Sequence, residues 1–125
     1  MGWDMEIDQH LAVAQRIERS LQKCGPADYE MKIEAAMLAG THWLNAALHR
    51  EGVTRPEGDV FHTYLLTINE FRRLCVAGDA MMQALAQIED LRPAFVRGNR
   101  AGGESAAEQA LELLSVIRTK AAAAD

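Results

Sequence analysis

The sequence predicts an all-α protein, built as an up-and-down antiparallel bundle of four to five helices. Ala, Leu and Met dominate the composition, whereas the aromatic residues are only two Trp, two Tyr and three Phe, a bias toward helix formers over strand formers. Apolar residues recur at spacings of three and four, which is typical of helices, and no useful stretch alternates apolar and polar residues as a strand does. The short loops between these segments favour antiparallel neighbours.

The chain has the size of one domain. Its 125 residues suffice for one hydrophobic core but not for two. We therefore expect a single bundle domain over residues 1–125, with a frayed tail at residues 121–125. A content of 49% hydrophobic and 25% charged residues is typical of a soluble globular protein.

The first two helices are separated by a glycine-proline stop. Residues 4–23 carry one apolar helical stripe, which Gly25 and Pro26 end. Asp28 is the N-cap expected for a second helix, which runs from residue 29 to residue 49 or 50. This helix should lie at the centre of the bundle, because it contains small residues that allow a neighbouring backbone to approach closely. These residues are Ala35, Ala36, Ala39, Gly40, Ala46 and Ala47.

Two further helices are expected in the middle of the chain. Residues 52–58, which include Pro56, predict a loop, and Asp59 is the expected N-cap of a third helix. The sequence Ala-Gly-Asp at residues 77–79 predicts a short turn whose Asp caps a fourth helix. Pro93 should kink or end that helix.

The last helix should follow a polar, glycine-rich stretch at residues 97–103. Ser105 and Glu108 have the S-x-x-E spacing of a capping box, in which each side chain bonds the other residue's backbone N–H. The sequence therefore places the start of the last helix at Ser105.

Charge and cysteine content exclude several function classes. A net charge of -5 argues against a protein that coats DNA, which needs excess Lys and Arg to displace phosphate counterions. Cys24 and Cys75 do not form a C-x-x-C unit, so we expect buried reduced thiols. The acidic N-terminus does not resemble a secretory signal, and no apolar run approaches the roughly 18 residues needed to span a bilayer. We expect a cytoplasmic protein without membrane association.

The four histidines are the candidate metal ligands of the chain: His10, His42, His49 and His62. None belongs to an H-E-x-x-H or E-x-x-H motif. His42 and His49 share a helix face but lie two turns apart, about 10 Å along the axis, which is too far for both to bind one ion. A mononuclear site could still form from one of them together with His10 or His62 on other helices. Histidines that only hydrogen-bond a neighbouring helix need no metal. We therefore assign no catalytic residue, metal or cofactor.

Four polar residues gather where the fourth helix gives way to the glycine-rich turn: Arg92, Arg97, Asn99 and Arg100. Guanidinium groups match phosphates and carboxylates, so this cluster is the candidate ligand-binding site for an anion. Cations at a helix C-terminus also stabilise the helix dipole without any ligand. Both interpretations remain open on the sequence.

The order of features over residues 29–120 resembles the HEPN superfamily of small helical domains, which often act as RNases or accompany nucleotidyltransferases. The resemblance rests on the Ala-rich second helix ending in HWLNAALHREGV, on the loop RPEGDVFHTY, and on the stretch LAQIEDLRPAFVRGNRAGGESAAEQALELLSVI. The last stretch is similar to the family's leucine-arginine turn, which leads by a glycine-rich loop into a capped final helix.

The motif of the catalytic members is incomplete here. Those proteins carry an Arg followed four to six residues later by a His, usually paired across a homodimer that cleaves RNA. Arg92 matches the Arg, but no His occurs after His62. Cleavage by 2′-OH attack needs a group that exchanges a proton near neutral pH, and Arg stays charged. The resemblance therefore implies a non-catalytic member that dimerises and binds a nucleotide, RNA or a protein partner.

Three functions follow from these patterns. The leading hypothesis is a non-catalytic interaction or binding module that acts as a homodimer and takes an anionic ligand, RNA or a protein partner. The first alternative is a metal-dependent hydrolase or RNase of the helical-bundle type that uses the histidines. The second alternative is a structural bundle whose main property is self-association.

Overall fold

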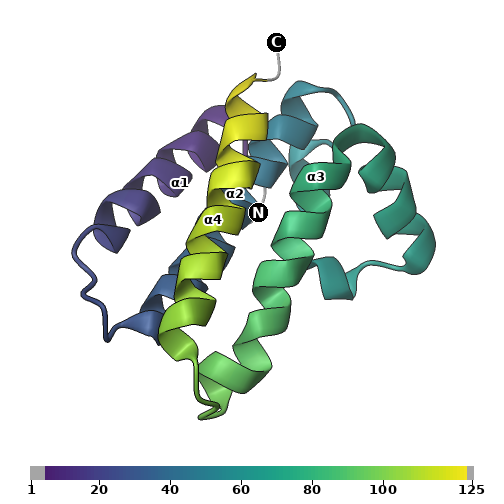
Figure 1. The fold of residues 1–125 in the computed structure, drawn as a ribbon. Coiled ribbons are helices and arrows are strands. Elements are labelled where there is room, and N and C mark those ends of the chain that lie inside the picture. The colour runs from purple at the N-terminus through teal and green to yellow at the C-terminus, as the bar shows by residue number, and fades with distance from the viewer. Residues whose placement is uncertain (1–4, 124–125) are drawn as a thin grey trace.

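Four α-helices pack together in the computed structural model, which describes residues 5–123 (Figure 1). They are α1 (Ile7–Leu21), α2 (Tyr29–Arg50), α3 (Ile68–Arg92) and α4 (Gly103–Ala123), with short helical turns η1 (Pro56–Gly58), η2 (Thr63–Leu65) and η3 (Pro93–Arg97). Residues 5–123 contain no strand. The all-α bundle expected from the sequence is confirmed.

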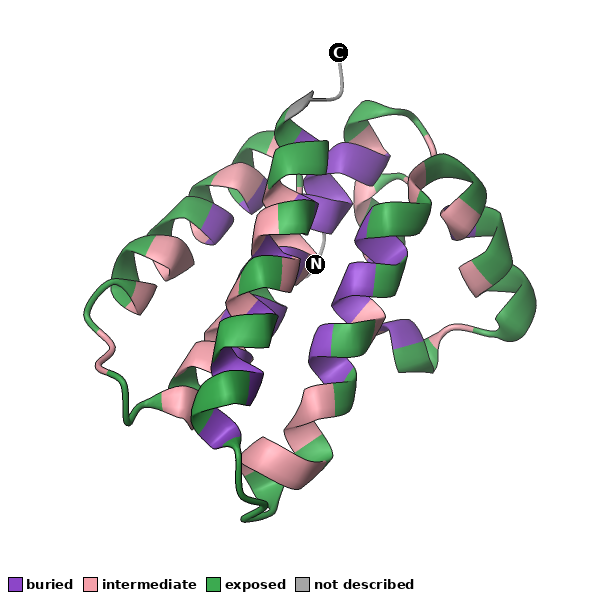
Figure 2. Ribbon diagram, viewed as in Figure 1, coloured by how far each residue is buried: buried purple, intermediate pink, exposed green. Residues whose placement is uncertain are grey.

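Helix α2 is the centre of the bundle, as predicted. It contacts α1, α3 and α4, and its buried positions are spread around the helix (Figure 2). Gly40 explains how closely the neighbours approach, since a Cβ atom there would lie 3.0 Å from Ile117 Cδ1 of α4 and 3.6 Å from Leu85 Cδ1 of α3. The small residues of α2 thus let three helices share one core.

Helix α1 lies against α2, with its polar side facing outward. Its Glu18 accepts a hydrogen bond of 2.5 Å from Trp43 Nε1 of α2 and pairs with Arg118 of α4. The residue expected to start this helix, Asp4, lies outside the described residues, and the helix itself begins at Ile7.

The third helix begins eight residues later than predicted. Asp59 is not its N-cap; Thr67 is, in a capping box with Glu70, and the helix starts at Ile68. The prediction was wrong because Thr67-x-x-Glu70 supplies a complete cap, while side chains from α2 and α3 hold the segment before it in an irregular path. This leaves Asp59 free for another role.

The turn predicted at residues 77–79 is a kink inside one helix. Gly78 has non-helical backbone angles (φ -154°, ψ 59°), yet the chain continues as α3 on both sides of it. The predicted third and fourth helices are therefore the two arms of α3. The helix ends at Arg92, immediately before Pro93, as predicted.

The last helix starts earlier and ends later than predicted. It begins at Gly103, so Ser105 lies inside the helix and is not its N-cap. A Cβ atom at Gly103 would collide with the ring of Tyr29, which shows how tightly the start of α4 contacts the start of α2. Helix α4 continues through Ala123 with Ala121 buried, where the sequence predicted a frayed tail; residues 124 and 125 lie outside the described part.

No helix among residues 5–123 combines the length and the apolar character that a membrane crossing requires.

Candidate metal centre

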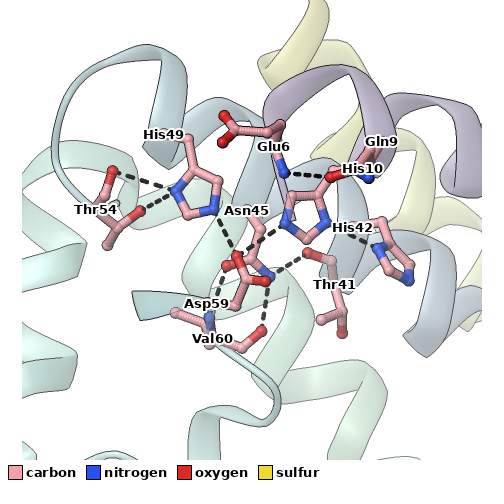
Figure 3. A network of polar contacts seen from close by, with 10 residues as sticks. All are labelled: Glu6, Gln9, His10, Thr41, His42, Asn45, His49, Thr54, Asp59 and Val60. Atoms are coloured by element: carbon pink, nitrogen blue, oxygen red, sulfur yellow. Dashed lines mark hydrogen bonds and ion pairs between the residues drawn. The ribbon is translucent and has the colours of Figure 1, made fainter. Parts of the chain in front are cut away.

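Two histidines and one carboxylate converge in a buried cluster between α1, α2 and the loop before η2 (Figure 3). Asp59 Oδ1 lies 2.8 Å from His10 Nε2 and 2.5 Å from His49 Nε2. The side chains of His10 and His49 are each 3% exposed, and that of Asp59 is 4% exposed. The ligand atoms of all three lie within 4.8 Å of one another.

The ring of His10 lies close to both histidines of α2. His42 and His49 face the same side of α2 two turns apart, and the ring of His10 from α1 lies between them. Its centroid is 5.2 Å from that of His42 and 5.3 Å from that of His49. His10 Nδ1 contacts His42 Nδ1 at 2.9 Å, while its Nε2 faces Asp59.

The second nitrogen of His49 faces Thr54. His49 Nδ1 lies 2.7 Å from Thr54 Oγ1 and 3.2 Å from the Thr54 carbonyl oxygen. The Thr54 carbonyl only accepts, whereas its hydroxyl either donates or accepts. In the tautomer that donates from Nδ1 to Thr54, His49 Nε2 presents a lone pair 2.5 Å from Asp59 Oδ1, and a metal ion bound there would have ligands from both side chains.

His42 is suited to hold His10 in the same state. Its pKa is lowered, first by burial and then by the neighbouring His10, against a smaller opposite effect of Asp59 and a further lowering by Arg16. When a neutral His42 accepts the Nδ1 proton of His10, His10 Nε2 has a lone pair that can bind an ion. Metal-binding histidines commonly donate their second N–H in this way.

The loop that carries Asp59 is anchored by an amide on α2. Asn45 lies between His42 and His49 on the same helix face, is buried, and forms two hydrogen bonds of 2.7 Å with the backbone N–H and carbonyl of Val60. The turn that brings Thr54 back to His49 passes through Gly52, whose φ of 73° favours glycine. Both features position the cluster from α2.

The donor set and its geometry fit a divalent transition ion. Two imidazoles and a carboxylate are ligands that zinc takes in catalytic sites. A tetrahedral ion with bonds of about 2.0 Å places its ligand atoms roughly 3.3 Å apart. Each imidazole nitrogen, now 2.8 Å or 2.5 Å from Asp59 Oδ1, would need to separate from that oxygen by less than about 1 Å.

A pocket of about 370 Å³ adjoins the cluster. Its polar lining residues include His10, His42 and Asp59. Its apolar wall is formed by Met5, Met37, Leu38, Val60 and Phe61. A three-ligand site beside a pocket leaves one coordination position for water or substrate, as catalytic zinc sites do.

His62 lies apart from the cluster but lines the same pocket. Its Nδ1 lies 2.9 Å from Glu89 Oε2 of α3. Glu89 is buried and also accepts hydrogen bonds from the backbone N–H and the hydroxyl of Thr63. Of the four histidines proposed as ligands, the structure thus brings His10 and His49 to one point, with His42 beside them and His62 across the pocket.

The proposed anion-binding residues are not gathered in one cleft. Arg92 forms an ion pair with Glu34 of α2 at 2.5 Å, and this hydrogen bond raises its pKa. Arg97 is exposed. Asn99 and Arg100 are exposed and line a shallow hollow at the start of α4. Anion binding by this cluster stays a prediction.

Comparison with models of known protein families, with curated proteins and with solved structures finds no match to the chain.

Proposed function

We propose that this protein is a metal-dependent hydrolase that holds a divalent ion of the zinc class with His10, His49 and Asp59. One observation carries the proposal: His49 Nε2 lies 2.5 Å from Asp59 Oδ1 while Nδ1 of the same ring is committed to Thr54. A metal ion would take the place of the proton in this contact, and the adjoining pocket would give a substrate access to it. This is the first alternative raised by the sequence.

Hydrolysis is favoured over redox chemistry by the surroundings of the cluster. Two histidines and one carboxylate also hold iron(II) in oxygenases, where the reaction draws on an oxidant. Hydrolysis needs only water, which a bound zinc-class ion polarises and acidifies. The pocket also contains His62, a residue type that transfers protons near neutral pH.

The test begins with metal content. Protein purified without chelators should contain zinc at close to one equivalent per chain, and the apoprotein should bind one Co²⁺ with the intense visible absorption of a four-coordinate ion. Asp59→Asn and His49→Gln should lose this absorption. Asp90→Asn, which removes an exposed carboxylate on α3, is the matched control and should keep it.

Two results would overturn the proposal. The first is an apoprotein that binds no cobalt at about 1 mM, since such weak affinity is irrelevant to a resident ion. The second is a protein that selects iron(II) and excludes zinc, which would replace hydrolysis by oxygen chemistry. The homodimer and the RNA or protein partner suggested by the sequence remain predictions, which light scattering and binding assays can test separately.

A further inference from the structure

We propose that His62 is the proton-transferring residue of this centre, that Glu89 is its positioning residue, and that the substrate is an uncharged ester or amide with an apolar group. The inference rests on the proposed function, because it assigns the second half of the same pocket. The ion would activate water in the pocket, and His62, which lines the same pocket, would exchange a proton with that water and with the leaving group.

The contact between Glu89 and His62 sets the imidazole for this task. The Glu89 carboxylate, whose side chain is 2% exposed, accepts the Nδ1 proton of His62 and leaves Nε2 as the nitrogen available to a ligand. Within the described part of the chain, no hydrogen bond to His62 Nε2 is formed. The ring of Tyr64 stacks on that of His62, with centroids 4.7 Å apart at 15°, so the imidazole is held from two sides.

Anchoring the loop does not by itself explain this arrangement. Glu89 already binds the loop through the backbone N–H and hydroxyl of Thr63, and both contacts would persist without an imidazole. His62 is 26% exposed in its side chain and lines the pocket that reaches Asp59. A carboxylate that orients an accessible histidine is the arrangement used for general acid-base transfer.

The pocket wall indicates the substrate class. Met37, Leu38 and Phe61 face the space beside the cluster, and no Lys or Arg is among the described residues that line it. A phosphate ester would bring charges for which the wall has no fixed cationic partner apart from the ion. An uncharged carbonyl compound with an apolar substituent fits the lining better.

The reaction balances with water as the only co-reactant. Water gives one proton to His62 Nε2, and its oxygen forms a bond to the acyl carbon; an ion held by His10, His49 and Asp59 would make that water more acidic. The bond from that carbon to the leaving oxygen or nitrogen then breaks, and the electron pair stays on the leaving atom. His62 returns the proton to that atom, so that the products are a carboxylic acid and an alcohol or amine.

The leaving group provides the readout. Phenyl acetate releases a phenolate about as basic as tyrosinate (pKa about 10), so its hydrolysis is accelerated by an acid that protonates the leaving oxygen. p-Nitrophenyl acetate releases a much weaker base, which needs that proton less. For the zinc-loaded protein, with the rate of the zinc-free protein subtracted, we expect His62→Gln to lower kcat about 100-fold on phenyl acetate and much less on p-nitrophenyl acetate. Glu89→Gln should shift the two rates in the same unequal way. Val76→Ser, an exposed site on α3, should match the wild type.

Cobalt absorption and circular dichroism, measured on each variant, separate the possible failures. A wild type that binds no metal contradicts the proposed function itself. A folded, metal-loaded His62→Gln protein that hydrolyses both esters at wild-type rates overturns the role of His62, as does an equal loss on both esters. A metal-loaded wild type that cleaves neither ester, or that cleaves p-nitrophenyl phosphate in preference to both, overturns the substrate class.

Discussion

His10 Nε2 lies 2.8 Å from Asp59 Oδ1, which joins the first helix of the bundle to a loop that the chain reaches 49 residues later. The cluster therefore connects α1 to this loop. His10 is its residue on α1, and the loop that carries Asp59 is held to α2 by the amide of Asn45. Any ligand that binds both side chains therefore ties α1 to the rest of the fold. Stability and metal binding should be coupled.

The first prediction concerns that coupling. An ion that binds the folded chain at 100 times its Kd should raise the free energy of unfolding by about 2.7 kcal/mol. Thermal denaturation followed by circular dichroism should show a higher Tm with zinc than with EDTA. The Asp59→Asn variant should show equal Tm values in both, and so should His10→Gln. A wild-type Tm that is insensitive to zinc would contradict the coupling.

The second prediction concerns His42, which touches His10 and is not one of the three ligands. His42→Ala removes the acceptor of the His10 Nδ1 proton, and the loss of such an outer partner typically weakens metal affinity 10–100-fold. Competition of Co²⁺ against a chelator of known affinity measures the change. His49→Ala should weaken binding much further. If the two variants were equally impaired, His42 would have to be counted among the ligands.

Periodicity predicted the helices well but not the loops between them. The stripes and caps located α1 and α2 to within a few residues, because local propensity and apolar spacing decide where those helices run. Asp59 was assigned to a helix cap because an Asp after a proline-containing loop is typical of one. The tertiary contacts of Asn45 with Val60 override that local preference, and no single-sequence pattern shows them.

The candidate site was partly foreseeable. All four histidines are possible ligands on the sequence, and the two-turn spacing of His42 and His49 predicts a site that combines one of them with a histidine from another helix. What the sequence could not show is that Asp59 meets His10 and His49 at one point, since that depends on how α1 lies on α2. A usable signal was the polar set His42, Asn45 and His49, because every other residue between positions 42 and 49 is apolar.

The third prediction concerns the contact of Gly40 on α2 with Ile117 on α4. Gly40→Ala gains about 1 kcal/mol of helix propensity but places its methyl group 3.0 Å from Ile117 Cδ1, so the single change should be close to neutral. Ile117→Val removes that atom and should cost 0.5–1.5 kcal/mol (a rough range for this substitution). The double variant should be more stable than the sum of the two effects. Urea denaturation of the four proteins gives the coupling energy, and simple additivity would mean that the methyl group fits without displacing Ile117.

The last prediction concerns pH and the capping box of α3. The backbone N–H and then the hydroxyl of Thr67 hold the pKa of Glu70 below its ordinary value of 4.5. A carboxylate whose pKa is lower in the folded state contributes stability above its unfolded pKa and loses it as the pH falls through the folded value. The free energy of unfolding of the wild type should therefore exceed that of Glu70→Gln by a constant amount near neutral pH, and the difference should shrink as the pH falls below 4.5. Urea denaturation of both proteins between neutral and acid pH checks this, with Thr67→Ala as the control in which the dependence on Glu70 is smaller, because the hydroxyl is removed while the backbone N–H stays. A difference that stayed constant through the acid range would show that the Glu70 charge takes no part in the cap.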